Sequence, residues 1–309
     1  MLDVLLNFCN EKDVKYTVKK SISEISPIGI GGEAMLYALP NTKEKLIDLV
    51  EFLRAEDIRY MIVGGMSNIL AQDEFYNGIV ISTRDINEVS IEGNCVRANA
   101  GVYLPRVITV AKKHSLGGAE ELFGIPGTVG GALVSNAGAF GKSISDFLVS
   151  VELYDASKHC TVTLYNEELE FSYRSSNVKA SGLIVLNAVL SLEQLQTAEI
   201  EKRIKLFQAM RSASQPTDAR SLGSVFKRYN GIGAGYFIDR CGLKGRSYGG
   251  AEISRKHAGF IVNNGGATAR DCITLIEVVR QSIIDKFGIE LELEIEIMGG
   301  LPQNKYGLN

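Results

Sequence analysis

The sequence predicts a two-domain protein that mixes α-helices and β-strands, and three observations lead to this expectation. Its 309 residues exceed the roughly 100–200 residues of one ordinary domain. Apolar residues recur at helical spacing in some segments and form short β-branched runs in others. Hydrophobic residues make up 45% of the chain and charged residues 22%, which is typical of a globular protein. One elaborate domain with an insertion is the alternative, and a disordered or collagen-like chain is excluded.

The first half of the chain alternates between the two periodicities. Residues 43–57 carry apolar side chains three and four positions apart, which predicts an amphipathic helix. Residues 60–63 then have the pattern of a buried strand that ends in glycine. The other elements expected here are strands at 79–81 and 95–100, a helix at 104–113, a hairpin of strands 147–154 and 161–165, and a strand at 183–190.

The second half begins with a polar run at residues 193–211 that contains no glycine or proline, which predicts a helix. Pro216 follows shortly afterwards, so we expect a domain boundary near residues 195–215. A second long helix is expected at 269–287, because Thr268 has the capping-box spacing to an acidic residue.

The last predicted element is a strand at residues 290–297. Glutamates alternate there with Leu and Ile, so all four carboxylates would leave one face of the strand. Such a pattern is most simply a solvated strand face. The glutamates are Glu290, Glu292, Glu294 and Glu296.

Composition narrows the class of function. The net charge of −3 and the pI near 5.8 leave no broad basic field, which argues against nucleic acid as a partner and favours small molecules. No apolar stretch approaches the roughly 20 residues that span a bilayer, and the N-terminus has no signal-peptide pattern. We therefore expect a cytoplasmic protein without membrane insertion. The sequence does not indicate any protein partner.

Cysteine and histidine spacing gives no metal or disulfide signature. The five cysteines are scattered and never spaced as C-x-x-C, and the three histidines lie far apart. We therefore expect a reduced protein without a bound metal.

Residues 29–34 match the G-x-G-x-x-A pattern of a dinucleotide-binding turn. Pro27 stands where the preceding strand should end, and residues 35–39 continue as a strand rather than opening a helix. We interpret this segment as a plain glycine turn.

Two other glycine segments are stronger candidates for a ligand site. Residues 63–70 form a strand end followed by Gly64 and Gly65 and then by a hydroxyl and an amide, groups suited to a pyrophosphate. Taken alone, this pattern is more often an ordinary turn. Residues 123–141 are so dense in glycine that helix or strand is disfavoured, which indicates backbone held close to a ligand or a tight crossing.

Further motifs extend along the chain. They are Gly124–Ala132, Tyr173–Ser176, Gly223–Lys227, Gly242–Gly245, Ser254–Asn263 and Leu291–Glu294. In this order they resemble the UDP-N-acetylenolpyruvoylglucosamine reductase family, also called UDP-N-acetylmuramate dehydrogenase or MurB, over about residues 25–299. The short connection after Arg174 is similar to the subgroup that lacks an extra substrate-covering loop.

The resemblance implies an α+β fold, with a two-lobed FAD-binding domain of the PCMH/vanillyl-alcohol-oxidase type and a smaller α+β substrate-binding domain. The first would comprise residues 1–200 completed by a C-terminal strand at 290–309, and the second residues 201–290. It further implies an NADPH-dependent flavin oxidoreductase of peptidoglycan synthesis, with a role in cell-wall biogenesis, cell shape, cell cycle and cell division. Its small-molecule partners would be NADPH and UDP-N-acetylenolpyruvoylglucosamine.

The resemblance also assigns three residues to the chemistry. Arg174 would hold the substrate carboxylate with its charged fork, and Ser224 would protonate the substrate carbon. Glu294 would act as an acid beside them. Its choice over Glu292 and Glu296 depends on the family register alone.

Binding residues are implied in the same way. For FAD they are Gly64, Gly65, Ser67, Asn68, Gly124, Ile125, Pro126, Gly127, Thr128, Gly130, Gly131, Asn136, Gly138 and Ala139. For the substrates they are Tyr173, Arg211, Lys227, Lys256 and His257. Several have ordinary alternatives as turn residues or surface charges.

The chain departs from the family pattern at four places. Met66 replaces a glycine of the phosphate turn, Gly29 replaces a basic residue, Phe140 replaces a tyrosine, and Tyr229 replaces a proline. If position 66 needs a left-handed backbone, methionine costs on the order of 1–2 kcal/mol there. Two alternatives therefore stay open: a flavoprotein of the same fold with a different nucleotide-sugar or enol substrate, and a non-catalytic UDP-sugar-binding paralogue.

Overall fold

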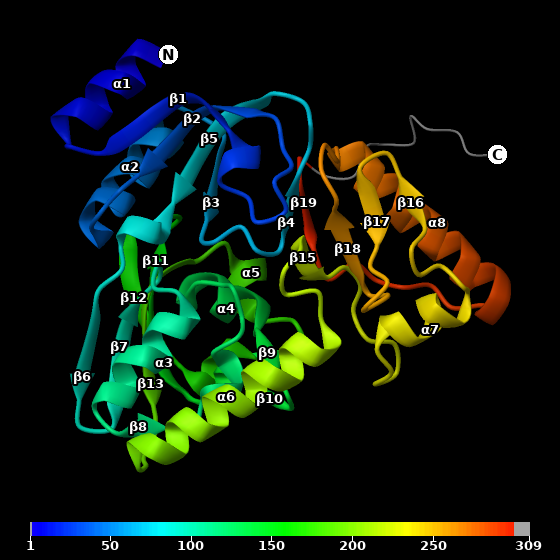
Figure 1. Cartoon of the computed structure of the whole chain (residues 1–309). Helices are drawn as coiled ribbons and strands as arrows, with labels where there is room; N and C mark the ends of the chain where they lie inside the picture. The colour runs from blue at the N-terminus through cyan, green and yellow to red at the C-terminus, as the bar shows by residue number, and fades with distance from the viewer. Residues whose placement is uncertain (1, 300–309) are drawn as a thin grey trace. The chain divides into compact units, whose positions relative to one another are not determined.

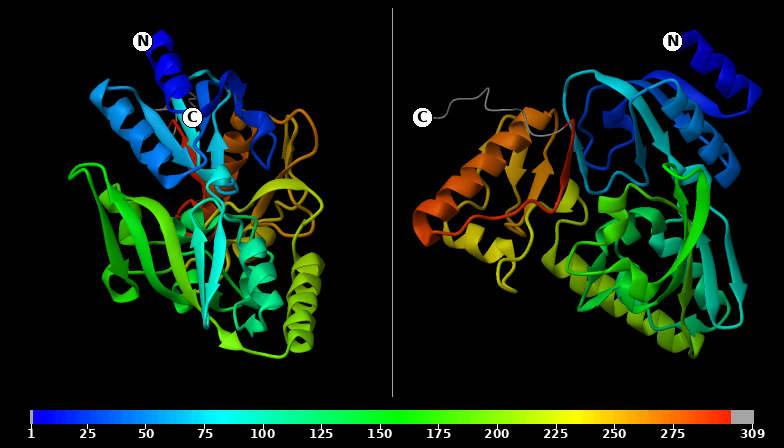
Figure 2. Two further views of the ribbon diagram at one scale, coloured as in Figure 1. Left: turned by 90° about the vertical axis from the view of Figure 1, so that its left-hand side faces the viewer. Right: turned by 180° about the vertical axis from the view of Figure 1, so that it is seen from behind.

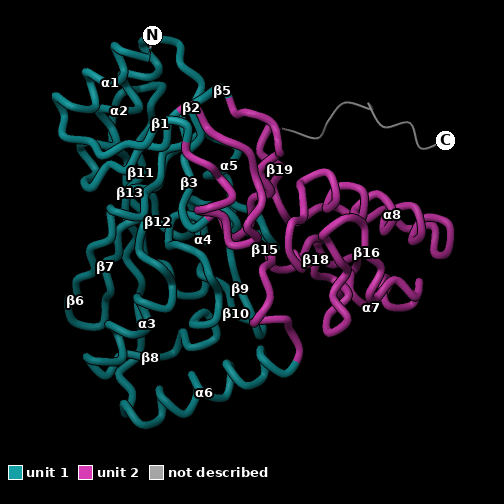
Figure 3. The backbone as a smooth tube through the Cα atoms, turned by 45° about the horizontal axis from the view of Figure 1, so that its top comes forward, with its two compact units in different colours: residues 1–19, 36–65, 77–213 teal, residues 20–35, 66–76, 214–309 magenta. Residues whose placement is uncertain are grey.

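The computed structural model describes residues 2–299, which form two compact units (Figure 3). Of the described residues, unit 1 comprises 2–19, 36–65 and 77–213, and unit 2 comprises 20–35, 66–76 and 214–299. Two short segments of the first half therefore pack with the second half of the chain. Residues 300–309 of the C-terminal strand predicted at 290–309 lie outside the described residues.

One sheet of unit 1 is built on the predicted αβ step. Its four strands have the order β1-β2-β5-β3, and β3 runs parallel to β5 (Figure 1). Helix α2 begins after Thr42, whose hydroxyl accepts from the Lys45 N–H, and it buries the apolar stripe seen in the sequence. The bounds are α1 Leu2–Glu11, β1 Lys15–Ser21, β2 Glu33–Leu39, α2 Lys43–Ala55, β3 Tyr60–Val63 and β5 Tyr76–Ser82.

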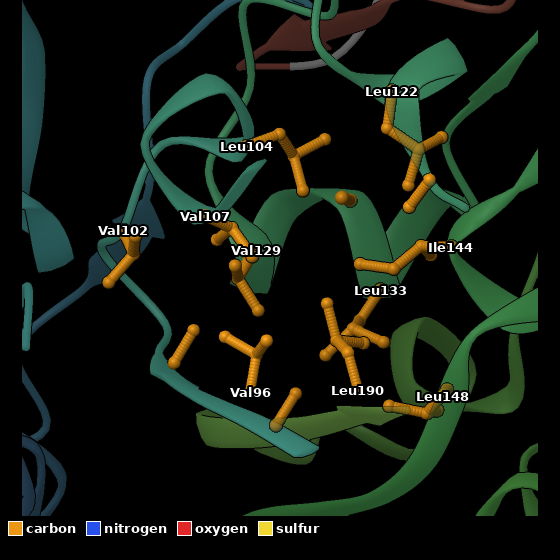
Figure 4. Packing of buried hydrophobic residues seen from close by; sticks show 14 of the residues in the cluster. Val96, Val102, Leu104, Val107, Leu122, Val129, Leu133, Ile144, Leu148 and Leu190 are labelled. Atoms are coloured by element: carbon orange, nitrogen blue, oxygen red, sulfur yellow. The ribbon is translucent and has the colours of Figure 1, made fainter. Parts of the chain in front are cut away.

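The main core of unit 1 lies against a five-stranded antiparallel sheet of order β12-β11-β13-β7-β6. Figure 4 shows side chains from β7, β13, α3 and α4 meeting in this core, among them Val96, Leu104 and Leu133. The bounds are β6 Val89–Glu92, β7 Cys95–Asn99, α3 Leu104–Lys113, α4 Val129–Ser135, β11 Leu148–Asp155, β12 Cys160–Tyr165 and β13 Ile184–Ser191.

Short elements complete unit 1. The two-stranded pairs are β9 with β10 and β8 with β14. Their bounds, with those of the remaining helices, are β8 Leu116–Gly117, β9 Gly138–Ala139, β10 Lys142–Ser143, α5 Asn177–Ser181, β14 Glu193–Gln194 and α6 Thr197–Ser214. The 3₁₀ turns of the chain are η1 Ile22–Glu24, η2 Thr83–Asp85, η3 Glu120–Leu122, η4 Ile144–Asp146 and η5 Asn166–Leu169.

Unit 2 contains a four-stranded antiparallel sheet of order β15-β18-β17-β16. Helix α8 packs against β16 and β17, as the view from behind in Figure 2 shows. Its N-terminus has the predicted capping box of Thr268 and Asp271, and Gly288 ends it in the left-handed conformation. The bounds are β15 Arg220–Ser224, α7 Ala234–Arg240, β16 Ser247–Tyr248, β17 Ala251–Ile253, β18 Phe260–Asn263 and α8 Ala269–Phe287.

The segment 66–76 is tied into unit 2 at two points. Its strand β4 (Ile69–Ala71) pairs in parallel with β19 (Glu296–Met298). The Asp73 carboxylate accepts from the backbone N–H groups of Ala269, at 2.8 Å, and Arg270, at 3.1 Å, at the start of α8. These bonds satisfy helix donors that have no partner within the helix, so they fix this segment to α8.

Most predicted elements are confirmed, with α3, β3 and α8 at the expected bounds. The predicted strand at 290–297 is wrong for its first six residues, because regular pairing begins only at Glu296. The predicted helix at 193–211 begins later, at Thr197, because Glu193 and Gln194 pair as β14 with β8. No helix within residues 2–299 is long and apolar enough to cross a membrane.

Candidate active site

Gly64 and Gly65 of the first glycine segment lie beside residues 126–128 of the second segment in unit 1. A Cβ on Gly64 would collide with the Thr128 hydroxyl oxygen. A Cβ on Gly65 would lie 3.1 Å from Tyr103 Cε1 and 3.3 Å from the Pro126 carbonyl oxygen. Glycine at position 64 therefore lets the turn after β3 pack directly against the Thr128 side chain, and position 65 is tightly packed.

The second glycine segment is held in place by backbone bonds. Val129 donates its N–H to the Val102 carbonyl at 2.8 Å, and Gly130 donates to the Ala100 carbonyl at 2.9 Å. The buried Thr128 hydroxyl accepts from Gly131 N–H at 3.4 Å. These bonds join residues 124–131, called the cradle below, to the backbone that follows β7.

Glycine-rich backbone of this kind can present N–H groups to the pyrophosphate of a dinucleotide cofactor such as FAD. Two of the predicted FAD residues, Ser67 and Asn68, belong to unit 2. The other predicted FAD residues all belong to unit 1: Gly64, Gly65, Gly124, Ile125, Pro126, Gly127, Thr128, Gly130, Gly131, Asn136, Gly138 and Ala139.

Arg84 adds a positive charge beside the cradle, and no sequence motif predicts it. Its Nη2 donates to the Tyr37 hydroxyl at 2.7 Å, and it also hydrogen-bonds Tyr103, the ring next to Gly65. Burial lowers the pKa of Arg84, but the bonds to Tyr37 and Tyr103 raise it, and the net shift is upward. No motif marks Arg84, because its partners come from other segments of the chain.

Arg174 is held in a tight turn of unit 1. Ser172 and Ser175 exchange both backbone hydrogen bonds around the Tyr173–Arg174 pair, and Arg174 has φ +55°, in the left-handed region. Its guanidinium donates through Nη2 to the Gly138 carbonyl at 3.0 Å and lies 5.3 Å from the Tyr173 ring centre. Left-handed backbone at a residue other than glycine or asparagine is uncommon and is often found at functional sites.

Asn136 supports this turn. Its side-chain amide donates to the Ser172 carbonyl at 3.0 Å, while its oxygen accepts from Ser145 N–H. The predicted contact of Asn136 with the cofactor stays a prediction.

Arg211 of helix α6 and Phe140 of the second glycine segment make contacts between that helix and residues 123–141. The Arg211 side chain covers Gly124, where a Cβ would lie 2.8 Å from Arg211 Cδ. Burial, and then the nearby charge of Arg174, lowers the pKa of Arg211. Phe140, the departure from tyrosine, stacks on Phe207 of α6 with ring centres 5.0 Å apart. Two guanidinium groups within electrostatic range of each other favour an anionic ligand.

Ser224 and Glu294 are brought together in unit 2. Ser224 ends β15, and its hydroxyl donates to the Phe226 carbonyl at 3.1 Å. Glu294 donates its backbone N–H to the carbonyl of Val225, the next residue, at 2.8 Å. The third predicted catalytic residue, Arg174, belongs to unit 1.

His257 lies next to Ser224. Its Nδ1 accepts from Gly259 N–H at 3.1 Å, and a Cβ on Gly259 would lie 3.0 Å from His257 Cε1 and 3.4 Å from Ser224 Oγ. Burial, followed by the nearby charge of Lys244, lowers the pKa of His257. A backbone hydrogen bond opposes this shift, but the net direction is downward and favours the neutral ring. Because Nδ1 accepts, a neutral ring would carry its proton on Nε2.

The predicted substrate lysines differ in their surroundings. Lys227 pairs with Glu292 at 3.0 Å across an exposed surface, a contact worth at most about 1 kcal/mol, so an anionic ligand can displace it. Lys256 lies in the loop between β17 and β18, where its backbone N–H donates to the Ser254 hydroxyl at 3.2 Å.

Gly29 stands where the family pattern has a basic residue, and a cation from another part of the chain lies near it. Gly29 has φ +69°, and a Cβ there would lie 3.1 Å from Arg220 Nη1 and 3.6 Å from Asn263 Nδ2. Arg220, from β15, thus brings its guanidinium over this position. A cation from β15 therefore lies beside the position where the resemblance leads us to expect a basic residue.

Met66 adopts the left-handed conformation, with φ +53°, and its side chain is 3% exposed. Left-handed backbone costs about 1–2 kcal/mol, whereas emptying a buried methionine site costs about 2–5 kcal/mol. We therefore expect Met66→Gly to lower the free energy of unfolding by about 1–3 kcal/mol. Urea denaturation of the apoprotein measures this change.

Asp57→Gly provides the matched control, because Asp57 has φ +51° but an exposed side chain. Glycine there relieves the same backbone strain without emptying a buried site, so stability should be unchanged or slightly higher. A Met66→Gly protein as stable as Asp57→Gly would show that the Met66 side chain contributes nothing.

Comparisons with known proteins agree with this architecture. Residues 34–162 match a family model described as an FAD binding domain, and residues 215–298 match the model of the UDP-N-acetylenolpyruvoylglucosamine reductase C-terminal domain. These matches confirm the predicted fold class.

Relatives of similar length cover almost the whole chain. UDP-N-acetylenolpyruvoylglucosamine reductase of Caldanaerobacter subterraneus subsp. tengcongensis is 39% identical over 301 residues, which is 97% of this chain and 99% of that protein. The same-named protein of Clostridium perfringens is 38% identical and covers 96% of each chain. The crystal structure of the Thermus caldophilus enzyme superposes with a TM-score of 0.78 and 33% identity over 92% of this chain and 98% of that one. The motif resemblance is thereby confirmed, and the chain belongs to the UDP-N-acetylenolpyruvoylglucosamine reductase family.

Proposed function

We propose that this protein is an NADPH-dependent flavin oxidoreductase that reduces UDP-N-acetylenolpyruvoylglucosamine to UDP-N-acetylmuramate. The observation that carries the proposal is the similarity to reductases of that name over 97% of the chain. The product is used in peptidoglycan synthesis, so the reaction would contribute to cell-wall biogenesis, cell shape and cell division. We place the protein in the cytoplasm, where NADPH and nucleotide sugars are found.

FAD is the cofactor that the glycine cradle would hold, and bound FAD would take a hydride from NADPH and pass it to the enol-ether carbon of the substrate. The backbone around Gly64, Gly65 and Thr128 would approach the pyrophosphate. Arg84, fixed by two tyrosine hydroxyls, would add a positive charge beside it.

Side chains of this protein would stabilise the negative charge that develops on the substrate and would supply the proton. Hydride addition at one carbon leaves negative charge on its neighbour and on the attached carboxylate. Arg174 would bind that carboxylate, and its bond to the Gly138 carbonyl would orient the fork. Ser224 would donate a proton to the neighbouring carbon, and Glu294 would act as the acidic partner.

The remaining predicted residues would bind the anionic and polar parts of the substrates. Arg211, Lys227 and Lys256 offer cations for phosphates, and His257 offers a neutral N–H donor. Tyr173 would contact the substrate next to Arg174. The predicted FAD-binding domain at 1–200 with 290–309, and the substrate domain at 201–290, remain part of this proposal.

The visible spectrum of the purified protein tests the proposal. We expect flavin absorption that bleaches on anaerobic addition of NADPH and returns when the enolpyruvyl substrate is added. Bleaching without recovery would indicate a different enol or nucleotide-sugar substrate. A protein that cannot be loaded with flavin would instead be a non-catalytic UDP-sugar-binding paralogue.

A further inference from the structure

We propose that Asn68 is a positioning residue for the catalytic acid Glu294, in addition to any contact with the cofactor. The proposal rests on the function proposed above, because it assumes that Glu294 acts on the substrate. It concerns contacts within unit 2 only.

Asn68 and Val225 each hold the backbone on one side of the Glu294 Cα atom. The Asn68 side-chain amide donates to the Glu294 carbonyl at 3.0 Å. On the other side, the Glu294 N–H donates to the Val225 carbonyl at 2.8 Å. With both peptide groups held, φ and ψ of Glu294 are fixed, and so is the direction in which its side chain leaves the backbone.

The side-chain bond is needed because strand pairing does not reach this residue. Glu294 lies in a bend, and the ladder between β4 and β19 begins with the Ile69 and Glu296 pair. Glu296 donates its N–H to the backbone carbonyl of Asn68 at 2.8 Å. Asn68 therefore contacts the chain on both sides of Ile295, once through its side chain and once through its backbone.

The same contacts connect Glu294 with the other groups of the site. Val225, which holds the Glu294 N–H, follows Ser224 and donates its own N–H to the Gly259 carbonyl at 2.9 Å. Asn68 itself belongs to the turn with Met66 and Ser67 that is predicted to meet the cofactor. The turn that is predicted to contact the cofactor is thus hydrogen-bonded to the backbone of the residue that carries the proposed acid.

Hydrogen exchange measures the positioning role without requiring turnover. We expect the Asn68→Ala holoprotein to show at least tenfold faster exchange at the Glu294 and Glu296 amides, because the bend loses its side-chain bond. Asn166→Ala is the matched control, since Asn166 also donates its side-chain amide to a backbone carbonyl, that of Ser145, at 2.9 Å. Unchanged exchange at both amides in Asn68→Ala would overturn the proposal.

Half-reaction kinetics at saturating FAD test the consequence for catalysis. Asn68→Ala should slow flavin reoxidation by the substrate by about 10–100-fold, as loss of an orienting partner typically does, and should shift the pH profile of that step. Flavin reduction by NADPH should change less than about threefold, because Glu294 has no part in it. In a Glu294→Gln background, Asn68→Ala should add less than about twofold, because the glutamine amide cannot act as an acid and its position no longer affects proton transfer.

Two kinetic results would contradict the proposal. One is a loss of FAD affinity with normal reoxidation once FAD is saturating, which would make Asn68 a cofactor ligand only. The other is a double variant whose loss of reoxidation rate equals the product of the losses in Asn68→Ala and Glu294→Gln. If the wild-type protein never reoxidises with the enolpyruvyl substrate, the proposed function fails, whereas the exchange experiment still decides the positioning role.

Discussion

Ser224→Ala is expected to slow flavin reoxidation by the substrate by about 10²–10⁴-fold, the usual contribution of a general acid. The hydroxyl at the end of β15 is the proposed proton donor, and alanine removes it without adding bulk. Flavin reduction by NADPH should proceed at the wild-type rate. Stopped-flow absorbance at the flavin band separates the two half-reactions.

Ser221→Ala is the matched control, because Ser221 lies on the same strand and pairs with Val262 of β18. We expect both half-reactions of this variant to match the wild type. Ser224→Cys retains an ionisable proton donor and should recover part of the lost rate. If Ser224→Ala reoxidises as fast as Ser221→Ala, another group donates the proton.

Arg174→Asn is expected to lower kcat/KM by about 10²–10³-fold without lowering stability. Asparagine tolerates the left-handed conformation that Arg174 adopts at φ +55°, so the turn between Ser172 and Ser175 should persist. The charged fork that would bind the substrate carboxylate is lost. Steady-state kinetics and thermal unfolding measure the two effects separately.

Arg174→Lys distinguishes the contribution of the positive charge from that of the paired guanidinium N–H donors. Lysine keeps the positive charge but not the planar pair of donors, so we expect an intermediate loss that appears mainly in KM. Equal activity of Arg174→Lys and wild type would show that charge alone is sufficient. Unfolding of Arg174→Asn well below the wild-type temperature would show that the arginine stabilises the turn.

Local sequence patterns were sufficient to predict several elements. Helix α3 at Leu104–Lys113, strand β3 at Tyr60–Val63 and helix α8 at Ala269–Phe287 have the predicted bounds. Apolar periodicity and capping residues act within a few positions, so they can be read without knowledge of the rest of the chain. The rejection of a dinucleotide turn at residues 29–34 was also correct, because β2 follows at Glu33 instead of a helix.

The pattern at residues 290–297 led to a wrong prediction for a physical reason. Alternating glutamate and aliphatic residues are typical of a strand, but a strand also needs a partner backbone in register. Here Phe226 forms only an isolated bridge with Leu293, and β4 supplies a partner from Glu296 onwards. The chain therefore bends at Glu294.

The sequence alone determined the family, through motifs whose order and chemistry are specific, and it identified the glycines whose backbones approach each other. Only the tertiary structure decided which distant segments share a unit, such as residues 66–76 with 214–299. It also revealed Arg84 beside the cradle, Arg220 over Gly29, and the bond from Asn68 to Glu294. These contacts join residues far apart in the chain, and no local periodicity or propensity encodes which side chain will reach them.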